Sequence, residues 1–380
     1  MSENEEKIEI HRGLKGVYFD RSRVCYIDGR AGELRYRGYS IHDLAQHSTF
    51  EEACHLLLKV ELPTRAQLDS FTAELKAARR LPEGVVEIIR AVRNAHPMDV
   101  LRTGVSALAA FDPETADKSP EATLRKGMRL TAQVPMLVAA HEHIRNGREP
   151  VAPDLRLGHA ANFLYMLKGK APSADAARLM EIDMVLHAEH GSNASSFAAR
   201  VVAGTDADLH GAITAAVAAL AGPAHGGAAE NVMRMAQEIG DSSRAADYVR
   251  TKRKDGEPVM GFGHRVYRAE DPRARHMRAG VEKLSREMGQ PQWYQILEAV
   301  VAAMKPYARH GVNVNVDFYA GVVYFLNGIA EDLFVPIFAV GRVPGWTVQV
   351  LEQLENNILL RPLTHYTGPA PREYVPLDRR

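Results

Sequence analysis

The stretch HGAITAAVAALA, residues 210–221, repeats its apolar side chains with the period of an α-helix. Ile213, Ala216, Val217 and Leu220 fall on one face of that helix, since 3.6 residues complete a turn. The pair Gly222-Pro223 ends the run. The next stretch, AAENVMRMAQEIG (228–240), has the same period and stops at Gly240. Two consecutive helices are therefore predicted here.

Helical periodicity extends over most of the chain. Further helices are expected near residues 40–47, 50–59, 66–79, 83–95, 99–111, 122–145, 155–168, 174–188, 242–253, 271–288, 293–308, 317–329 and 345–359. Only residues 14–37 have strand and turn character, with Asp28-Gly29 as the turn signal. Because strands do not alternate with helices, we expect an all-α fold with a small N-terminal β element.

Two segments lack helical period. Residues 112–121 are predicted to form a surface loop. Residues 361–380 carry several prolines and are expected to form an extended tail lying over another surface, such as a second subunit.

Composition excludes several classes of protein. The 380 residues are 46% hydrophobic and 25% charged, which is typical of a soluble globular enzyme. The 47 basic residues balance the 47 acidic ones, so no chain-wide basic field is available for generic nucleic-acid binding. No segment reaches the ~18 consecutive apolar residues of a membrane span.

The chain's compartment is predicted from its start and its cysteines. MSENEEKIEIH is acidic and polar, unlike a signal or transit peptide. Cys25 and Cys54 are too few for a disulfide framework or a four-thiolate zinc site. We therefore expect a cytoplasmic protein with reduced thiols and no membrane partner.

Four segments interrupt the helical pattern with His, Asp, Arg and Gly. They are LHAEHGSN (186–193), GPAHGG (222–227), GFGHRVYRAEDPR (261–273) and NVNVD (313–317). Glycine-flanked turns let a ligand approach the backbone closely, so these segments are candidates for a functional site.

Each segment alone also has an ordinary structural explanation. The pair His187 and His190 lacks the HExxH arrangement, so no metal site is expected. Gly261 and Gly263 lack the third glycine of a dinucleotide fingerprint, and the P-loop pattern is absent. Asp317 alone could cap the helix that follows it.

Together the segments favour carbon–carbon bond chemistry. His225 precedes a helix N-terminus, which favours the neutral imidazole that can donate a hydrogen bond to a carbonyl becoming an enolate. Asp317 suits a general base beside that carbonyl, and His264 could polarise a second carbonyl. Carboxylates would find guanidinium partners in Arg273, Arg342 and Arg361. This set is compatible with condensing an enolate with a keto-diacid.

At these residues the chain resembles the citrate synthase family. The matching segments, in order, are GLKGV (13–17), YRGY (36–39), HPMDVLR (96–102), 187–193, GPAHGG, GFGHRVYRAEDPR, NVDFYAGVVY (315–324), IFAVGR (337–342), LRP (360–362) and YTG (366–368). Gly341 stands where the pattern suggests a side chain such as Ala, which bears on local packing.

The resemblance implies an all-α fold with two domains. The large domain would comprise residues 1–225 and 323–380, and the small one 226–322. The implied reaction joins acetyl-CoA to oxaloacetate and hydrolyses the citryl-CoA thioester, as the entry step of the tricarboxylic acid cycle. It needs no metal and no further cofactor. A homodimer with shared active sites is implied, and the short N-terminal region favours a dimer without NADH inhibition.

The resemblance also assigns roles to residues. Asp317 would take the methyl proton of acetyl-CoA, His225 would donate to the thioester carbonyl, and His264 to the oxaloacetate ketone. His190, Arg273, Arg342 and, from the other subunit, Arg361 would bind oxaloacetate. Arg268 would face the CoA phosphates, and the 258–264 loop with Gly261 and Gly263 would cover CoA. Two alternatives remain: a 2-methylcitrate synthase that uses propionyl-CoA, and a non-catalytic member of the family.

Overall fold

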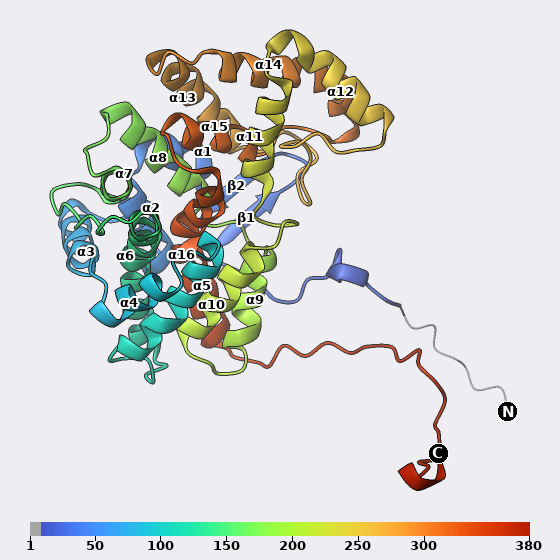
Figure 1. Ribbon diagram of the computed structural model, residues 1–380. Helices are drawn as coiled ribbons and strands as arrows, with labels where there is room; N and C mark the ends of the chain where they lie inside the picture. The colour runs from blue at the N-terminus through green and yellow to red at the C-terminus, as the bar shows by residue number, and fades with distance from the viewer. Residues whose placement is uncertain (1–8) are drawn as a thin grey trace.

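The computed structural model describes residues 9–380, so the acidic start of the chain, 1–8, lies outside it. One small antiparallel sheet, ordered β1-β2-β3, stands near the N-terminus (Figure 1): β1 is Cys25–Asp28, β2 Glu33–Tyr36 and β3 Tyr39–Ser40. The turn after β1 is held by Asp28, whose Oδ1 accepts the N–H groups of Arg30 and Ala31 at 2.8 and 2.9 Å. The predicted β element and its turn are confirmed.

Most of the rest of the described chain is helical, as expected for an all-α fold. One group of helices comprises α1 (Ile41–His47), α2 (Phe50–Lys59), α3 (Arg65–Ala77), α4 (Glu83–Ala91), α5 (Pro97–Leu108), α6 (Pro120–Arg145), α7 (His159–Lys168), α8 (Ala174–His187), α9 (Ala194–Ala203), α10 (Leu209–Leu220) and α16 (Phe334–Glu355). A second group comprises α11 (Ala228–Ile239), α12 (Ala245–Lys254), α13 (Ala274–Glu287), α14 (Gln292–Met304) and α15 (Asp317–Leu326), which pack on one another at the top of Figure 1.

The core of the first group is α16, which packs against α6, α8, α9 and α10. Its Trp346 is completely buried. Of the helices described, only the segment 331–355 is long and apolar enough to cross a membrane, and 94% of its apolar window is buried inside the protein. Burial of this kind identifies it as a core helix.

Two helices differ from the prediction. The first, α9, was not predicted; it begins after Asn193, whose side chain caps the N–H of Ser196. The second, α16, begins at Phe334 rather than near residue 345. Gly and Pro at positions 341–345 concealed its first half, yet Gly341 is where α16 meets α8: a Cβ there would lie 3.3 Å from Met184 Cα. Close packing therefore overrides the poor helix propensity.

Residues 361–380 form the extended tail that the prolines predicted, apart from a 3-10 turn at Leu377–Arg379. The tail leaves the end of α16 and runs away from the helices (Figure 1). Every residue in it is exposed.

Candidate active site

The predicted residues gather where the two helix groups meet. His190 lies between α8 and α9, His225 between α10 and α11, and Arg342 on α16. The second group supplies His264 and Arg273 from the loop before α13, and Asp317 as the first residue of α15. The rings of His190 and His264, from different groups, lie 5.2 Å apart.

The protonation of His264 is fixed by its own turn. Nδ1 accepts the backbone N–H groups of Val266 and Tyr267 at 3.0 and 3.2 Å. A nitrogen that accepts cannot carry the proton, so the neutral ring holds it on Nε2. Burial and the nearby Arg273 lower the pKa of His264 to about 4. His264 is therefore a neutral imidazole with an Nε2–H group that makes none of the described hydrogen bonds.

The loops that carry His264 and Asp317 are joined to each other. Phe262 pairs with Val314 in a short antiparallel bridge. Gly263 N–H donates to the carbonyl of Asn313 at 2.8 Å, and Asn315 N–H donates to the carbonyl of Gly261 at 2.9 Å. Gly261 has φ +76°, and a Cβ there would lie 2.5 Å from the Phe318 ring. Glycine at this position thus allows the two loops to pack together.

Asp317 is held at the start of α15, where Asn315 Oδ1 accepts its N–H at 3.1 Å. The capping side chain is therefore Asn315, which leaves the Asp317 carboxylate for another role. Burial raises the pKa of Asp317, against the opposing effect of His187 and Arg273. A raised pKa makes a carboxylate a stronger base.

His225 is oriented by residues of α9 and α16. Ser195 N–H lies 3.3 Å from His225 Nε2, and Ser195 Oγ lies 2.9 Å from the same atom. Trp346 Nε1–H donates to Ser195 Oγ at 3.0 Å. Because Nε2 accepts the N–H of Ser195, the proton of the neutral ring belongs on Nδ1. The pKa of His225 is lowered to about 4, first by burial and then by Arg342, so the ring is neutral.

His190 contacts the other helix group through Tyr267, with 3.1 Å between its Nε2 and the Tyr267 hydroxyl. Burial, followed by the charge of Arg273, lowers the pKa of His190 well below its ordinary value. His190 is thus also neutral, and it borders the His264 turn.

The two buried arginines differ in how they are paired. Arg273 binds Asp271 with both ends of its fork, Nε at 2.9 Å and Nη2 at 2.7 Å. Arg342 donates from Nε to the His187 carbonyl and lies over the Phe338 ring at 4.7 Å. Its Nη1 is buried and has no hydrogen-bond partner among residues 9–380. A buried cationic donor without a partner is costly, so Arg342 is prepared for an anion.

Two of the predicted residues, Arg268 and Arg361, are exposed rather than buried in this cluster. Arg268 is exposed, and its Nη1 donates to the His264 carbonyl at 3.2 Å. Arg361 is exposed on the C-terminal tail. The tail that carries Arg361 runs away from both helix groups of its own chain (Figure 1).

Sequence reasoning missed several supporting residues. Tyr267 and Asp271 lie inside a quoted segment and Ser195 lies two residues after another, but nothing in their spacing shows which side chain each would contact. Phe338 gave no signal at all, although its ring packs edge-on against both His187 and His225.

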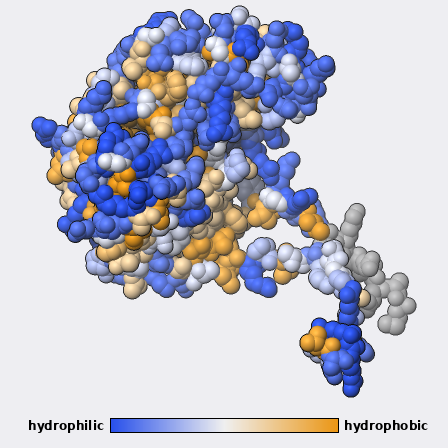
Figure 2. All heavy atoms as spheres, in the orientation of Figure 1, coloured by the Kyte–Doolittle hydropathy of each residue, from blue (hydrophilic) through white to orange (hydrophobic). Residues whose placement is uncertain are grey.

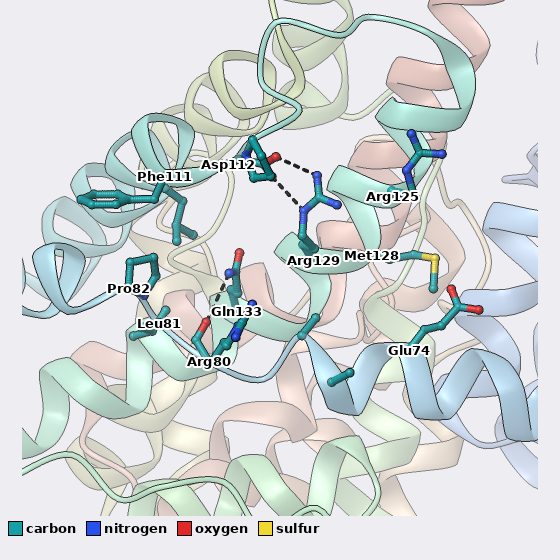
Figure 3. A pocket seen from close by; sticks show the side chains of 14 residues that line it. Glu74, Arg80, Leu81, Pro82, Phe111, Asp112, Arg125, Met128, Arg129 and Gln133 are labelled. Atoms are coloured by element: carbon teal, nitrogen blue, oxygen red, sulfur yellow. Dashed lines mark hydrogen bonds and ion pairs between the residues drawn. The ribbon is translucent and has the colours of Figure 1, made fainter.

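No three His, Cys, Asp or Glu side chains within residues 9–380 are grouped to hold a metal ion. A cavity of about 680 Å³ lies away from the site, between α3, the segment just before α4, the end of α5 and α6 (Figure 3). Its lining includes Phe111 and Arg129, with Arg129 bound to Asp112, and none of the predicted site residues.

Neutral imidazoles, a carboxylate with a raised pKa and a buried arginine thus lie together in an all-α protein, as in an enzyme that carries out acid–base chemistry. The family model described as "Citrate synthase, C-terminal domain" matches residues 13–363. The chain belongs to the citrate synthase family.

Named relatives span nearly the whole chain. A citrate synthase of Haloferax volcanii is 44% identical over 98% of this chain and 99% of its own. The 2-methylcitrate synthase 1 of Corynebacterium glutamicum is 40% identical over 98% of this chain and 99% of its own. A solved citrate synthase from Thermoplasma acidophilum, in a ternary complex with carboxymethyl coenzyme A and oxaloacetate, superposes with a TM-score of 0.91 at 30% identity, covering 98% of this chain and 100% of that one.

Proposed function

We propose that the protein condenses acetyl-CoA with oxaloacetate and hydrolyses the resulting citryl-CoA to citrate and CoA. The observation that carries this proposal is the contact of His264 with His190 across the two helix groups, with Arg273 near enough to both rings and to Asp317 to shift their pKa values. The reaction would be the entry step of the tricarboxylic acid cycle.

The first step forms the enolate. Asp317 takes a proton from the methyl group of acetyl-CoA, aided by the burial that raises its pKa. His225, with its proton on Nδ1, donates a hydrogen bond to the thioester oxygen as negative charge develops there. Ser195 and Trp346 keep the His225 ring in that orientation.

The second step forms the carbon–carbon bond. The enolate carbon attacks the ketone of oxaloacetate, whose oxygen accepts the Nε2–H of His264. The oxaloacetate carboxylates are bound by Arg342 and Arg273, with His190 beside them. Water then cleaves the thioester and releases CoA.

CoA is assigned to the second helix group. Arg268 offers an exposed guanidinium for a phosphate, and Gly261 and Gly263 form the loop that covers the thioester arm. We place the small domain at 226–322 and the large domain at 1–225 and 323–380, so the substrate would bind between them.

We also propose a homodimer whose active sites are shared. Tyr366 and Leu363 in the tail are 74% and 87% exposed, which is unfavourable for apolar side chains unless they cover a surface. The tail leaves the body beside apolar surface that includes Ile358 and Leu359 (Figure 2). A second copy of the chain would receive this tail and bring Arg361 to the partner's oxaloacetate site.

Mixed dimers of Asp317→Ala and Arg361→Ala test the sharing. In such a dimer one site carries both defects and the other carries neither. Random pairing makes half of the dimers mixed, so about a quarter of native activity should return. Mass spectrometry of co-expressed subunits confirms mixing, and confirmed mixed dimers that stay inactive would refute the role of Arg361 in the partner's site.

Release of the CoA thiol tests the reaction and its acyl substrate. Acetyl-CoA and propionyl-CoA are compared at matched concentrations with oxaloacetate, and acetyl-CoA is expected to give the higher kcat/KM. A preference for propionyl-CoA would instead make the protein a 2-methylcitrate synthase, a difference that one methylene, worth ~1–3 kcal/mol, can produce. Absence of thiol release with either would identify a non-catalytic member. The cytoplasmic location stays a prediction.

A further inference from the structure

The turn between β1 and β2 reaches the loop that carries His264. The N–H of Arg268 donates to the carbonyl of Gly29 at 2.7 Å, and the N–H of Ala269 approaches the same oxygen at 3.4 Å. Gly29 belongs to the N-terminal sheet, whereas Arg268 lies four residues after His264 in the second helix group. These backbone bonds join two parts of the chain that are remote in sequence.

The β1–β2 turn packs closely against the loop that follows His264 because positions 29 and 32 are glycine. A Cβ at Gly29 would lie 2.8 Å from the carbonyl carbon of Val266 and still closer to the carbonyl oxygen. A Cβ at Gly32 would lie 3.1 Å from the carbonyl oxygen of Glu270. Gly29 is not among the residues with positive φ. Its need for glycine is therefore a matter of space rather than of backbone conformation.

The turn touched by Gly29 is the one that orients the His264 ring. Val266 and Tyr267 supply the two N–H groups that bind His264 Nδ1. The Tyr267 hydroxyl reaches His190, and the side chain of Arg268 binds the His264 carbonyl. Any shift of Val266 therefore moves the hydrogen bonds that hold the proton of His264 on Nε2.

The β1–β2 turn, on the other side of this contact, is held by its own hydrogen bonds. Asp28 Oδ1 accepts two N–H groups of the turn, and Asp28 and Glu33 face each other where β1 pairs with β2. We propose that Gly29 is a positioning residue, which braces the 264–268 turn so that His264 aims Nε2–H at the ketone of oxaloacetate. This inference rests on the function proposed above for His264.

Gly29→Ala is the test, with Ala31→Ser as a matched control. Both changes add one heavy atom to the same turn, but Ala31 is exposed. The Gly29→Ala clash involves backbone atoms, so the turn must move by a sizeable fraction of an ångström. A misplacement of that order costs up to ~10²-fold in rate. We expect kcat to fall about 10- to 100-fold in Gly29→Ala and to stay native in Ala31→Ser.

The ketone stretching frequency of bound oxaloacetate, measured by infrared spectroscopy, reports directly on His264. Donation from Nε2–H lowers this frequency in the native enzyme. Gly29→Ala should lose most of that lowering while it melts near the temperature of Ala31→Ser. A Gly29→Ala enzyme with native frequency and native kcat would overturn the inference.

His264→Ala distinguishes failure of the donor role proposed for His264 from failure of the positioning role proposed for Gly29. If it keeps the lowered frequency, His264 is not the donor and the role proposed for it fails. If it loses the lowering and Gly29→Ala does not, only the positioning role fails.

Hydrogen exchange of the native protein with oxaloacetate bound keeps the inference testable if Gly29→Ala does not fold. The Arg268 amide should be protected by Gly29, and exchange at the rate of a free amide would overturn the inference.

Discussion

Arg342→Met should separate substrate binding from stability. Arg342 is only 1% exposed, and methionine fills similar space without charge. The substitution removes the charged bond to the His187 carbonyl, worth ~1.5–3 kcal/mol, and the stacking on Phe338, worth ~0.5–2 kcal/mol. It also removes the cost of the unpaired buried Nη1, which is ~1–3 kcal/mol or more. The losses, ~2–5 kcal/mol in all, exceed this relief by only about 1–2 kcal/mol, so the substrate-free protein should lose a small part of its stability.

Oxaloacetate binding, in contrast, should weaken strongly in Arg342→Met. Loss of a buried charge partner costs ~2–5 kcal/mol, which weakens binding about 30-fold to several thousand-fold. At 100 times its dissociation constant, oxaloacetate stabilises the native protein by ~2.7 kcal/mol. For a chain of 380 residues that corresponds to a rise in Tm of roughly 3 °C.

Thermal unfolding with and without oxaloacetate is the assay. Arg342→Met should melt close to the native protein without ligand, and the same ligand concentration should raise its Tm by at most about 1 °C. Arg342→Lys keeps the charge but not the fork, so it should retain part of the rise. A full ligand-induced rise in Arg342→Met would refute the assignment of Arg342 to a carboxylate.

Two further predictions concern binding order and pH. Oxaloacetate should bind first and create the acetyl-CoA site, because its ligands come from both helix groups; equal acetyl-CoA affinity by calorimetry with and without oxaloacetate would contradict this. The free energy of unfolding should fall as pH drops from 6.5, the ordinary pKa of histidine, towards 4. In the folded protein His225, His264 and His276 each have a pKa of about 4 and stay neutral over this range. The same histidines bind protons in the unfolded chain, which stabilises the unfolded state. A melting temperature that is flat across this range would show that these histidines are not held neutral.

The helical period sufficed to predict most elements, but two cases needed tertiary information. The α9 sequence is rich in small residues, and the helix is stabilised by packing on α10 and α16. In α16, Gly345 lies so close to the α8–α9 turn that a Cβ would come 3.1 Å from the Ala188 carbonyl carbon. Glycine lowers helix propensity, but here it lets α16 approach the neighbouring elements closely. The sequence of α16 alone does not reveal the surface against which it packs.

The candidate site residues were visible in the sequence because most of them interrupt the helical pattern with polar and glycine residues. Their supporting contacts were not, since each joins positions far apart in the chain. Trp346 reaches Ser195 across 151 positions, and Tyr267 reaches His190 across 77. Burial and the charge of Arg342, which lower the pKa of His225, are likewise known only from the fold.

The assignment of Asp317 as the base is tested most directly by Asp317→Asn, measured for both turnover and oxaloacetate binding. The amide keeps the size of the carboxylate but cannot accept the methyl proton. Loss of a general base typically costs ~10²-fold or more, so turnover should nearly vanish while calorimetry still detects oxaloacetate binding. If Asp317→Asn keeps more than about a tenth of native turnover, Asp317 is not the base and the account of the site is wrong.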